Sequence, residues 1–340
     1  METVPTAIVE SAQAPVRVSL VIPMFNEERS LPVLFDSIRS QTIAPDEIVL
    51  VDAGSTDKTL DVAESLAAVD HRIRIIKTER ATPGRGRNLG IASAQHDWTA
   101  LTDAGIVLDP RWLEQLVEAL RADPTVEVVY GNFEPLTRTF FERCAALSYP
   151  PPKVARPGGL MRGPSIASAM VQRRVWKAVG GFPDLRAAED LIFIEKIREQ
   201  GFKTAWAPQA TVWWELQPTV ARTFRKFVLY SRHNVWIGRQ WDWHYGVARK
   251  YIFGLIFLLL ALMHSWWWLL LPVAGTAARV ARSIWSRREG RGFLWLLNPF
   301  QFVGVALILL TIDVAAFWGW AQALRQQPEP SNSTPSTLQS

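Results

Sequence analysis

Acidic and amide side chains gather at three points of the sequence, each just after an apolar, β-branched run. Asn26 and Glu27 follow the first run, Asp52 ends the second, and Asp103 follows the third. Carboxylates and amides accept hydrogen bonds from base N–H groups and ribose hydroxyls, so these points together could hold a nucleoside. Any one aspartate taken alone is better explained as a helix N-cap. The three together favour a binding site.

The elements around these residues are expected to alternate between strand and helix. Apolar runs predict buried strands over 16–22, 47–51, 73–76 and 98–101, and helical spacing predicts helices over 28–41, 59–68, 88–94 and 111–121. This alternation predicts a doubly wound α/β sheet, in which ligands bind beyond the carboxyl ends of the strands. Gly54 and Ser55 would let the backbone turn beneath a base. Neither a G-x-G-x-x-G after the first strand nor a P-loop motif is present, which argues against a dehydrogenase or a P-loop enzyme.

The motifs, in this order, resemble the family 2 glycosyltransferases, enzymes with the GT-A (Rossmann-like) nucleotide-sugar fold. The resemblance runs from about residue 16 to 214 and begins with PMFNEE and DAGSTDKT. Residues 84–90 are similar to the Arg-Asn-x-Gly segment of the family, and residues 101–105 stand in the place of its DxD motif. Residues 180–184 and the pair Glu189-Asp190 are similar to its Gly-Gly-Phe segment and acceptor-side acids. The resemblance implies inverting transfer of a sugar from a UDP- or GDP-linked donor.

The expected site has a donor side and an acceptor side. Asp190, with Glu189 beside it, would be the catalytic base that takes the acceptor proton. Residues of the acceptor side would be Arg162, Gly181 and Phe182. Residues of the donor side would be Pro23, Phe25, Asn26, Glu27, Asp52, Gly54, Ser55, Arg85, Arg87, Asn88 and Asp103.

Two positions depart from the family pattern and concern the metal. Gly105 replaces the second acid of DxD, usually the divalent metal ligand, and Trp214 stands where many relatives place a histidine. Asp103 is then the only metal ligand that the motif retains, so we expect only weak dependence on Mg²⁺ or Mn²⁺ as a cofactor. The charge of a departing diphosphate would still need cations, and three arginines on loops (Arg85, Arg87 and Arg162) are candidates. The competing interpretation is that these arginines are solvated surface residues.

The last third of the chain has the composition of a membrane region. Residues 218–340 hold 13 Lys and Arg against 4 Asp and Glu, while residues 1–217 hold 24 against 28. Ten of the 16 Trp also lie beyond Pro218. Residues 251–278 carry no charge and residues 292–324 only Asp313, so each stretch is long enough to span a bilayer. Nucleic acid would use the same basic residues but would not require apolar stretches between them. Buried helices of a soluble core are the remaining alternative.

The number of spans stays open. Positive charges at Arg249-Lys250 and over 279–291 both favour the cytosolic side, which puts the two ends of the first apolar stretch on one side. A hairpin turning at His264-Ser265 would satisfy this, although each arm would be short. Two spans and three are both possible. Residues 1–15 show no signal peptide, so we expect an integral plasma-membrane protein with a cytosolic catalytic domain.

The expected organisation is a flexible segment over 1–15, the GT-A domain over 16–217, membrane-interface helices over 218–250, transmembrane helices over 251–325 and a disordered tail over 326–340. Residues 149–165 are too rich in Pro and Gly for helix or strand and are interpreted as a loop over the acceptor, or a linker. The single cysteine, Cys144, excludes an intrachain disulfide.

A membrane anchor next to the catalytic domain favours a lipid or lipid-linked acceptor. The Gln-x-x-Arg-Trp motif of processive polysaccharide synthases is missing, which favours transfer of single sugars. A polyprenyl-phosphate sugar synthase is a close alternative within the class. A non-catalytic nucleotide-sugar-binding membrane protein is the alternative from another class.

Overall fold

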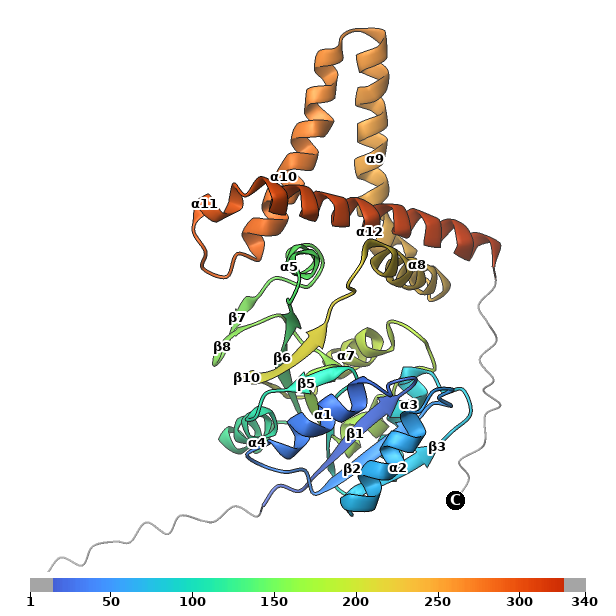
Figure 1. Ribbon diagram of the computed structural model, residues 1–340, viewed down its shortest axis with the longest axis vertical. Helices are drawn as coiled ribbons and strands as arrows, with labels where there is room; N and C mark the ends of the chain where they lie inside the picture. The colour runs from blue at the N-terminus through green and yellow to red at the C-terminus, as the bar shows by residue number, and fades with distance from the viewer. Residues whose placement is uncertain (1–14, 327–340) are drawn as a thin grey trace, which may run out of the picture.

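The computed structural model describes residues 15–326. The flexible segment and the disordered tail expected at the two ends lie almost entirely outside the described residues. Figure 1 shows an α/β domain beneath a group of C-terminal helices. The domain is built on an eight-stranded sheet of order β3-β2-β1-β4-β9-β6-β10-β5. Its strands are β1 (Val18–Met24), β2 (Glu47–Asp52), β3 (Ile73–Lys77), β4 (Trp98–Leu101), β5 (Ile106–Leu108), β6 (Val128–Leu136), β9 (Ala169–Gln172) and β10 (Thr204–Glu215).

The sheet is mixed, although its first half is parallel as expected. β1 pairs in parallel with β2 and β4, and β2 pairs in parallel with β3. The carboxyl ends of β1, β2 and β4 therefore share one edge, where the motif residues follow them. β9 then inserts antiparallel between β4 and β6, and β5 adds antiparallel to β10 at the far edge. Alternation of strand and helix over the first hundred residues could not reveal these later strands.

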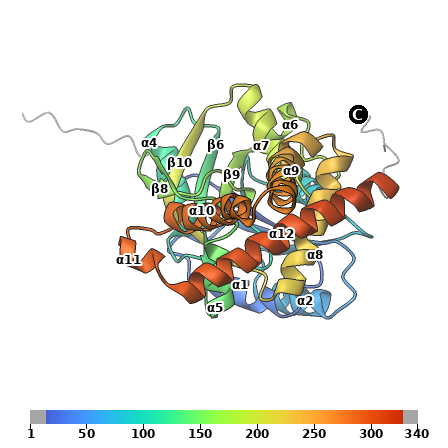
Figure 2. The ribbon, with the colours of Figure 1, turned by 90° about the horizontal axis from the view of Figure 1, so that it is seen from above.

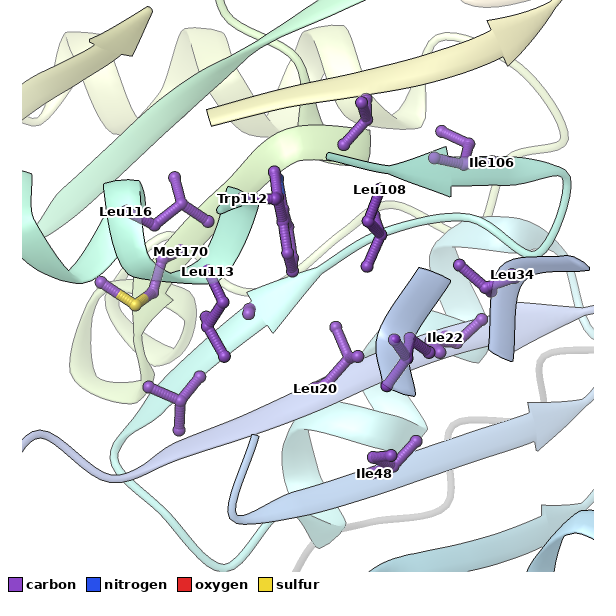
Figure 3. Close-up of a cluster of buried hydrophobic side chains, with 14 of the residues drawn as sticks. Leu20, Ile22, Leu34, Ile48, Ile106, Leu108, Trp112, Leu113, Leu116 and Met170 are labelled. Atoms are coloured by element: carbon purple, nitrogen blue, oxygen red, sulfur yellow. The ribbon is translucent and has the colours of Figure 1, made fainter. Parts of the chain in front are cut away.

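Helices cover both faces of the sheet because successive side chains of a strand point to opposite faces. Leu20, Ile22 and Ile48 face a core that also contains Leu34 and Trp112 (Figure 3). That face is covered by α1 (Ser30–Arg39), α2 (Thr59–Val69) and α4 (Trp112–Ala122). The intervening residues, such as Val21 and Val49, face a second core beneath α3 (Pro83–Ser93), α6 (Arg173–Ala178) and α7 (Glu189–Glu199).

Two local predictions differ from the structure. The third helix begins at Pro83 and not at residue 88, because the side chain of Thr82 caps it by accepting from the Arg85 N–H at 3.1 Å. Proline at the first helical position is favoured because its missing N–H needs no partner there. Residues 149–165 were expected to form neither helix nor strand. The structure has two short strands there, β7 (Val154–Arg156) and β8 (Gly159–Met161), which pair as an antiparallel ribbon.

The C-terminal helices form a separate layer above the carboxyl end of β10. They are preceded by α5 (Phe140–Ala146) and comprise α8 (Val220–Trp236), α9 (Gln240–Met263), α10 (Leu270–Ser286), α11 (Phe293–Leu296) and α12 (Pro299–Arg325). A third apolar core, with Cys144, Leu216, Ile284 and Ile308 among its members, joins α5 and the end of β10 to α10 and α12. Helices α9 and α12 are each long and apolar enough to cross a membrane by length and composition. No helix boundary falls at residue 250, because α9 runs on to Met263.

Candidate active site

The loops after β1 and β2 are tied together at the carboxyl edge of the sheet. The Asn26 backbone N–H donates to Ser55 Oγ at 3.0 Å, and the Asn26 side-chain Oδ1 accepts from the Thr56 N–H at 2.8 Å. Asn26 has a φ of 58°, a left-handed conformation that asparagine tolerates better than most residues. The Glu27 N–H donates to Thr59 Oγ1 at 2.6 Å. The predicted donor residues of these two loops therefore form one connected unit.

Asp52 is buried and supports its own loop. Its carboxylate accepts from the Gly54 and Ser55 N–H groups at 3.3 Å each, whereas helix α2 begins after Lys58. Asp52 is therefore not the N-cap of α2. Gly54 has a φ of 82°, and a side chain there would begin 3.0 Å from the Arg80 backbone nitrogen. Its lack of a side chain leaves one wall of a cavity open.

This cavity has a volume of about 510 Å³ and is lined by Gly54, Thr78, Glu79, Arg80 and Arg85. The volume lies within the range of small-ligand pockets. Arg85, a predicted donor-side cation, is half-buried in its wall. Phe25 is exposed near the same edge of the sheet. Pro23 lies beneath α3, and a side chain at Gly86 would come 3.2 Å from the Cβ of Pro23.

Arg87 is the centre of a buried ion-pair cluster. Its Nη2 donates to Asp103 Oδ1 at 2.6 Å, and its Nη1 donates to Glu189 Oε1 at 2.8 Å. Burial alone would lower the pKa of Arg87, but the charges of Asp103 and Glu189 and their hydrogen bonds raise it. Arg87 is 5% exposed, so it is neither a solvated surface residue nor a free cation of the donor pocket. It joins the DxD position to the acceptor-side acids.

Asn88 holds the Gly-Gly-Phe segment against α3. Its Oδ1 accepts from the Phe182 N–H at 2.9 Å and the Trp176 Nε1–H at 2.8 Å, and its Nδ2 donates to the Phe182 carbonyl at 2.8 Å. A side chain at Gly181 would come 2.7 Å from Asn88 Oδ1, which explains the glycine. Phe182 is buried, stacked on Phe193 with ring centres 3.8 Å apart. These three predicted site residues thus position the segment that precedes α7.

The two acids at the start of α7 have different environments. Glu189 is 7% exposed and bonded to Arg87, and burial together with the charge of Asp190 raises its pKa despite that bond. Asp190 is exposed, and its Oδ1 accepts from the Leu191 N–H at 2.8 Å. The N-cap of α7 is Ala188, with no side-chain cap, so capping does not explain Asp190. Its carboxylate is available to a substrate.

Helix α8 carries two buried polar side chains, Tyr230 and Lys226. Burial raises the pKa of Tyr230, and the charges of Asp190, Glu189 and Asp103 raise it further. One turn earlier, the Lys226 ammonium lies over the rings of Trp214, Tyr230 and Tyr149, at 5.0, 5.5 and 5.9 Å from their centres. Burial lowers its pKa, and among residues 15–326 no carboxylate is paired with it.

Sequence reasoning missed Lys226 because residues 218–250 were interpreted as membrane-interface helices, which assigned it to the membrane surface. Its spacing four residues before Tyr230 was the available signal, since such residues share a helix face.

Arg162 is the opposite case, a residue that was predicted for the site but lies elsewhere. Expected to face the acceptor, it donates instead to Glu134 at 2.9 Å and Glu289 at 2.6 Å, and to the Pro151 carbonyl at 2.8 Å. Arg162 is a buried connection between the sheet, the ribbon and the linker after α10.

The residues around Asp103 fit a divalent cation poorly. Asp103 already accepts from Arg87, and Gly105 supplies no carboxylate. The nearest second acid is Glu27, whose Oε2 lies 3.8 Å from where a side chain at Gly105 would begin. Burial raises the pKa of Glu27, and the charges of Asp103 and Asp57 add to this, although Ser30 donates to it. The described residues contain no group of three or more His, Cys, Asp or Glu placed to bind a metal.

Comparison with known proteins begins with a family match. The sequence model of "Glycosyl transferase family 2" matches residues 19–154. The chain is 25% identical over 265 residues to the O-antigen chain rhamnosyltransferase RfbN of Salmonella typhimurium. This alignment covers 74% of this chain and 83% of RfbN. It is 34% identical over 116 residues to the putative glycosyltransferase EpsH of Bacillus subtilis, and there the match spans only 33% of EpsH.

A similar fold occurs in the mannosyltransferase PcManGT from Pyrobaculum calidifontis, solved in complex with GDP-Man and Mn²⁺. The TM-score is 0.53 at 21% identity, and the superposition covers 89% of this chain and 87% of that one. At this identity the likeness concerns the fold alone. The mixed sheet with helices on both faces is therefore a GT-A arrangement.

Proposed function

The chain carries a family 2 glycosyltransferase domain, and from this premise we propose that it transfers a single sugar from a UDP- or GDP-linked donor to a lipid-linked acceptor at a membrane surface. One observation carries the proposal. Arg87 joins Asp103, at the end of a donor-side strand, to Glu189, so that the exposed carboxylate of Asp190 lies next to the donor edge of the sheet. A donor sugar over Asp103 would then have a base beside it.

The proposed reaction is a displacement at the anomeric carbon. An acceptor hydroxyl oxygen forms the new bond to C1, the bond from C1 to the diphosphate oxygen breaks, and its electron pair leaves with the nucleoside diphosphate. The hydroxyl proton passes to Asp190, because an alcohol attacks efficiently only when a carboxylate removes its proton. Arg85 and Lys226 are the cations offered to the leaving diphosphate. No step is assigned to a metal ion.

The lipid-linked acceptor is supported by a groove that Arg186, in the loop leading to the acids of α7, helps to line. The groove has a volume of about 450 Å³ and lies between α8, α12 and the loop before α7. Apolar side chains of Phe224, Val228, Leu229 and Trp318 line it together with Arg186, Arg225 and Arg232. An apolar chain bearing a phosphate matches this lining, because the arginines can pair with phosphate oxygens and the apolar side chains with hydrocarbon.

Membranes containing the protein, incubated with a panel of labelled nucleotide sugars, test the proposal. We expect one donor to give a labelled lipid whose mass exceeds that of its acceptor by one sugar residue. Asp190→Asn should lose the product and Glu199→Gln, an exposed acid at the far end of the same helix, should keep it. Labelled product from none of the donors, or in equal amount in membranes that lack the protein, would refute the proposal.

A polyprenyl-phosphate sugar synthase is the second candidate, and the arginines of the groove favour it. Its acceptor is a phosphate already ionised at neutral pH, so its product contains one phosphate and Asp190→Asn should retain most of the rate. A non-catalytic binding protein would bind the donor without releasing nucleoside diphosphate. The exposed Asp190 carboxylate, which no cap requires, argues against that alternative.

A further inference from the structure

Helices α9 and α10 form an apolar hairpin that stands away from the catalytic domain (Figure 1). Residues 251–278 contain no Asp, Glu, Lys or Arg. Their side chains are largely exposed, up to 76% at Met263 and 77% at Trp267 near the tip. The helices turn at His264-Ser265 and a short 3₁₀ segment, Trp266–Leu269. A surface this apolar is not stable in water and requires a partner.

The part of the hairpin beyond Lys250 and Arg279 is too short to cross a bilayer, although the whole of α9 is long enough. Its base is marked by Lys250 and Arg279, the charged residues that flank the apolar stretch. From Tyr251 to Met263 the first arm rises about 20 Å at 1.5 Å per residue, and from Leu270 to residue 278 the second rises about 14 Å. A hydrocarbon core is about 30 Å thick. The tip therefore reaches the interior of the bilayer without emerging on the other side.

Helix α12 is held at the base of the hairpin. Asp313, in the middle of α12, is 1% exposed and accepts from Arg279 Nη2 at 2.8 Å and from the Tyr251 hydroxyl at 3.2 Å. Tyr251 and Arg279 belong to the two arms of the hairpin, so this cluster fixes the level at which both arms leave the protein. Figures 1 and 2 show α12 running across this base and not along the hairpin.

The same helix is packed along α8, the helix that carries Lys226 and Tyr230. A side chain at Gly319 would come 2.6 Å from the Val228 carbonyl oxygen, and Ser231 Oγ donates to the Ala316 carbonyl at 2.7 Å. The opposite side of α12 presents an exposed apolar stripe at helical spacing, formed by Val303, Leu307, Leu310 and Val314. Near its start α12 packs on α5, where a side chain at Gly304 would come 2.6 Å from Cys144 Sγ, and at its end the Gln326 carbonyl accepts from Trp236 Nε1 at 3.1 Å, so both ends lie at the level of the catalytic domain.

Cations and tryptophans surround the base of the hairpin. Arg249 and Lys250 are exposed at the end of one arm, and Arg282 and Arg291 beyond the end of the other. Arg288 is stacked over Trp285, with its guanidinium carbon 3.6 Å from the ring centre. Basic residues and tryptophan are favoured at anionic headgroups. The charge of the base thus complements an anionic lipid surface.

We propose that the α9–α10 hairpin enters an anionic bilayer from the cytosolic face without crossing it, and that α12 lies along that face. This inference rests on the membrane location in the proposed function and does not depend on the transfer reaction. Both ends of the hairpin and the active site then lie on one side, as the positive charges at 249–250 and 279–291 require. The active site opens toward headgroups of the same leaflet.

Single cysteines in a Cys144→Ala background test the insertion. Ser265→Cys reports on the tip, Ser286→Cys on the base and Gln326→Cys on the end of α12. With an impermeant maleimide we expect no labelling of any of them in intact cells. In inside-out vesicles Ser286→Cys and Gln326→Cys should react, and Ser265→Cys should react only after detergent is added.

Several outcomes would overturn the inference. Labelling of Ser265→Cys in intact cells would mean that the hairpin crosses the bilayer, and labelling of Gln326→Cys there would mean that α12 crosses it. Reaction of Ser265→Cys in untreated inside-out vesicles would mean that the tip lies in water. A nitroxide at residue 265 gives a second measurement, and we expect it to be more accessible to oxygen than to a nickel chelate. Transfer activity, assayed in the same vesicles, separates failure of this inference from failure of the proposed function.

Discussion

Arg87 Nη1 lies 2.8 Å from Glu189 Oε1, although 102 residues separate them in the sequence. The bond joins helix α3, which follows the donor loops, to helix α7, which carries the acceptor-side acids. Both side chains are under 10% exposed, and Arg87 also bonds Asp103. The geometry of the candidate site therefore depends on one guanidinium.

Arg87→Met should be strongly destabilising. Removing one partner of a buried ion pair leaves an uncompensated charge, which typically costs about 3–5 kcal/mol. Urea unfolding of the detergent-solubilised protein measures the loss. The double variant Arg87→Met with Glu189→Gln should recover part of it, because the unpaired carboxylate is then removed. If the double variant is less stable than Arg87→Met alone, the ion pair is not the source of the loss.

Asp190→Asn should abolish most transfer with little change in stability. Loss of a general base typically lowers turnover about 10²–10⁴-fold. The fold should lose about 0.3–1 kcal/mol, the value of a charge at a helix N-terminus, because Ala188 and not Asp190 is the N-cap. Single-turnover rates and donor binding of purified protein test this. A variant with wild-type rates and a hydroxyl acceptor would remove Asp190 from the mechanism, and Glu199→Gln serves as the control.

Much of the catalytic domain was predictable because apolar runs and motif residues are local signals. The strands over 47–51, 73–76 and 98–101 occur within one residue of their predicted bounds, and the first is displaced by two. The GT-A fold is confirmed, and the family 2 glycosyltransferase model matches residues 19–154, as the motifs predicted. The roles of individual site residues stay predictions, but their contacts are now defined. Partners such as Glu189 for Arg87 are distant in sequence, and no local pattern specifies them.

The expectations that differ from the structure, for Arg162, Arg87 and Lys226, also arise because a local pattern does not specify tertiary contacts. Arg162 and Arg87 were interpreted as cations facing a phosphate, because spacing shows that a residue is charged but not which carboxylate it meets. Lys226 was assigned to the membrane surface, because an amphipathic helix that covers an active site has the same periodicity as one that lies on lipid. Only the tertiary contacts of α8 separate these cases.

Glu27→Gln should stabilise the protein at neutral pH but not in acid. Burial raises the pKa of Glu27 in the fold, so the folded state disfavours its ionised form. Below the unfolded pKa, about 4.3, both states are protonated and no penalty exists. As pH rises through the folded pKa, the penalty develops fully. The difference in melting temperature between the variant and wild type should therefore grow from pH 4 to pH 7. A constant difference, like that expected for Glu199→Gln, would contradict this account.

Lys226→Met should lower transfer without destabilising the fold. The ammonium is desolvated among three aromatic rings and lacks a carboxylate partner in the described chain, so methionine can replace its stem and contact the rings. Trp214 beneath it pairs in register with Ile106, the residue after Gly105, which puts this cation beside the incomplete DxD motif. We expect turnover to fall at least about tenfold, the effect of about 1.4 kcal/mol of lost transition-state stabilisation.

The response to EDTA and Mn²⁺, compared between wild type and Lys226→Met, separates a catalytic role of Lys226 from a structural one. If cationic side chains carry the charge of the leaving diphosphate, wild-type turnover should change little in EDTA, because Asp103 is already bonded to Arg87 and Gly105 offers no ligand. Lys226→Met should then respond to added Mn²⁺ more than wild type does, since a metal can replace the missing charge. Arg222→Met, an exposed cation one turn earlier on α8, is the matched control and should behave as wild type. Complete loss of wild-type activity in EDTA with full recovery in Mn²⁺ would show that the leaving group depends on a metal. Unchanged turnover in Lys226→Met would show that it does not depend on this lysine.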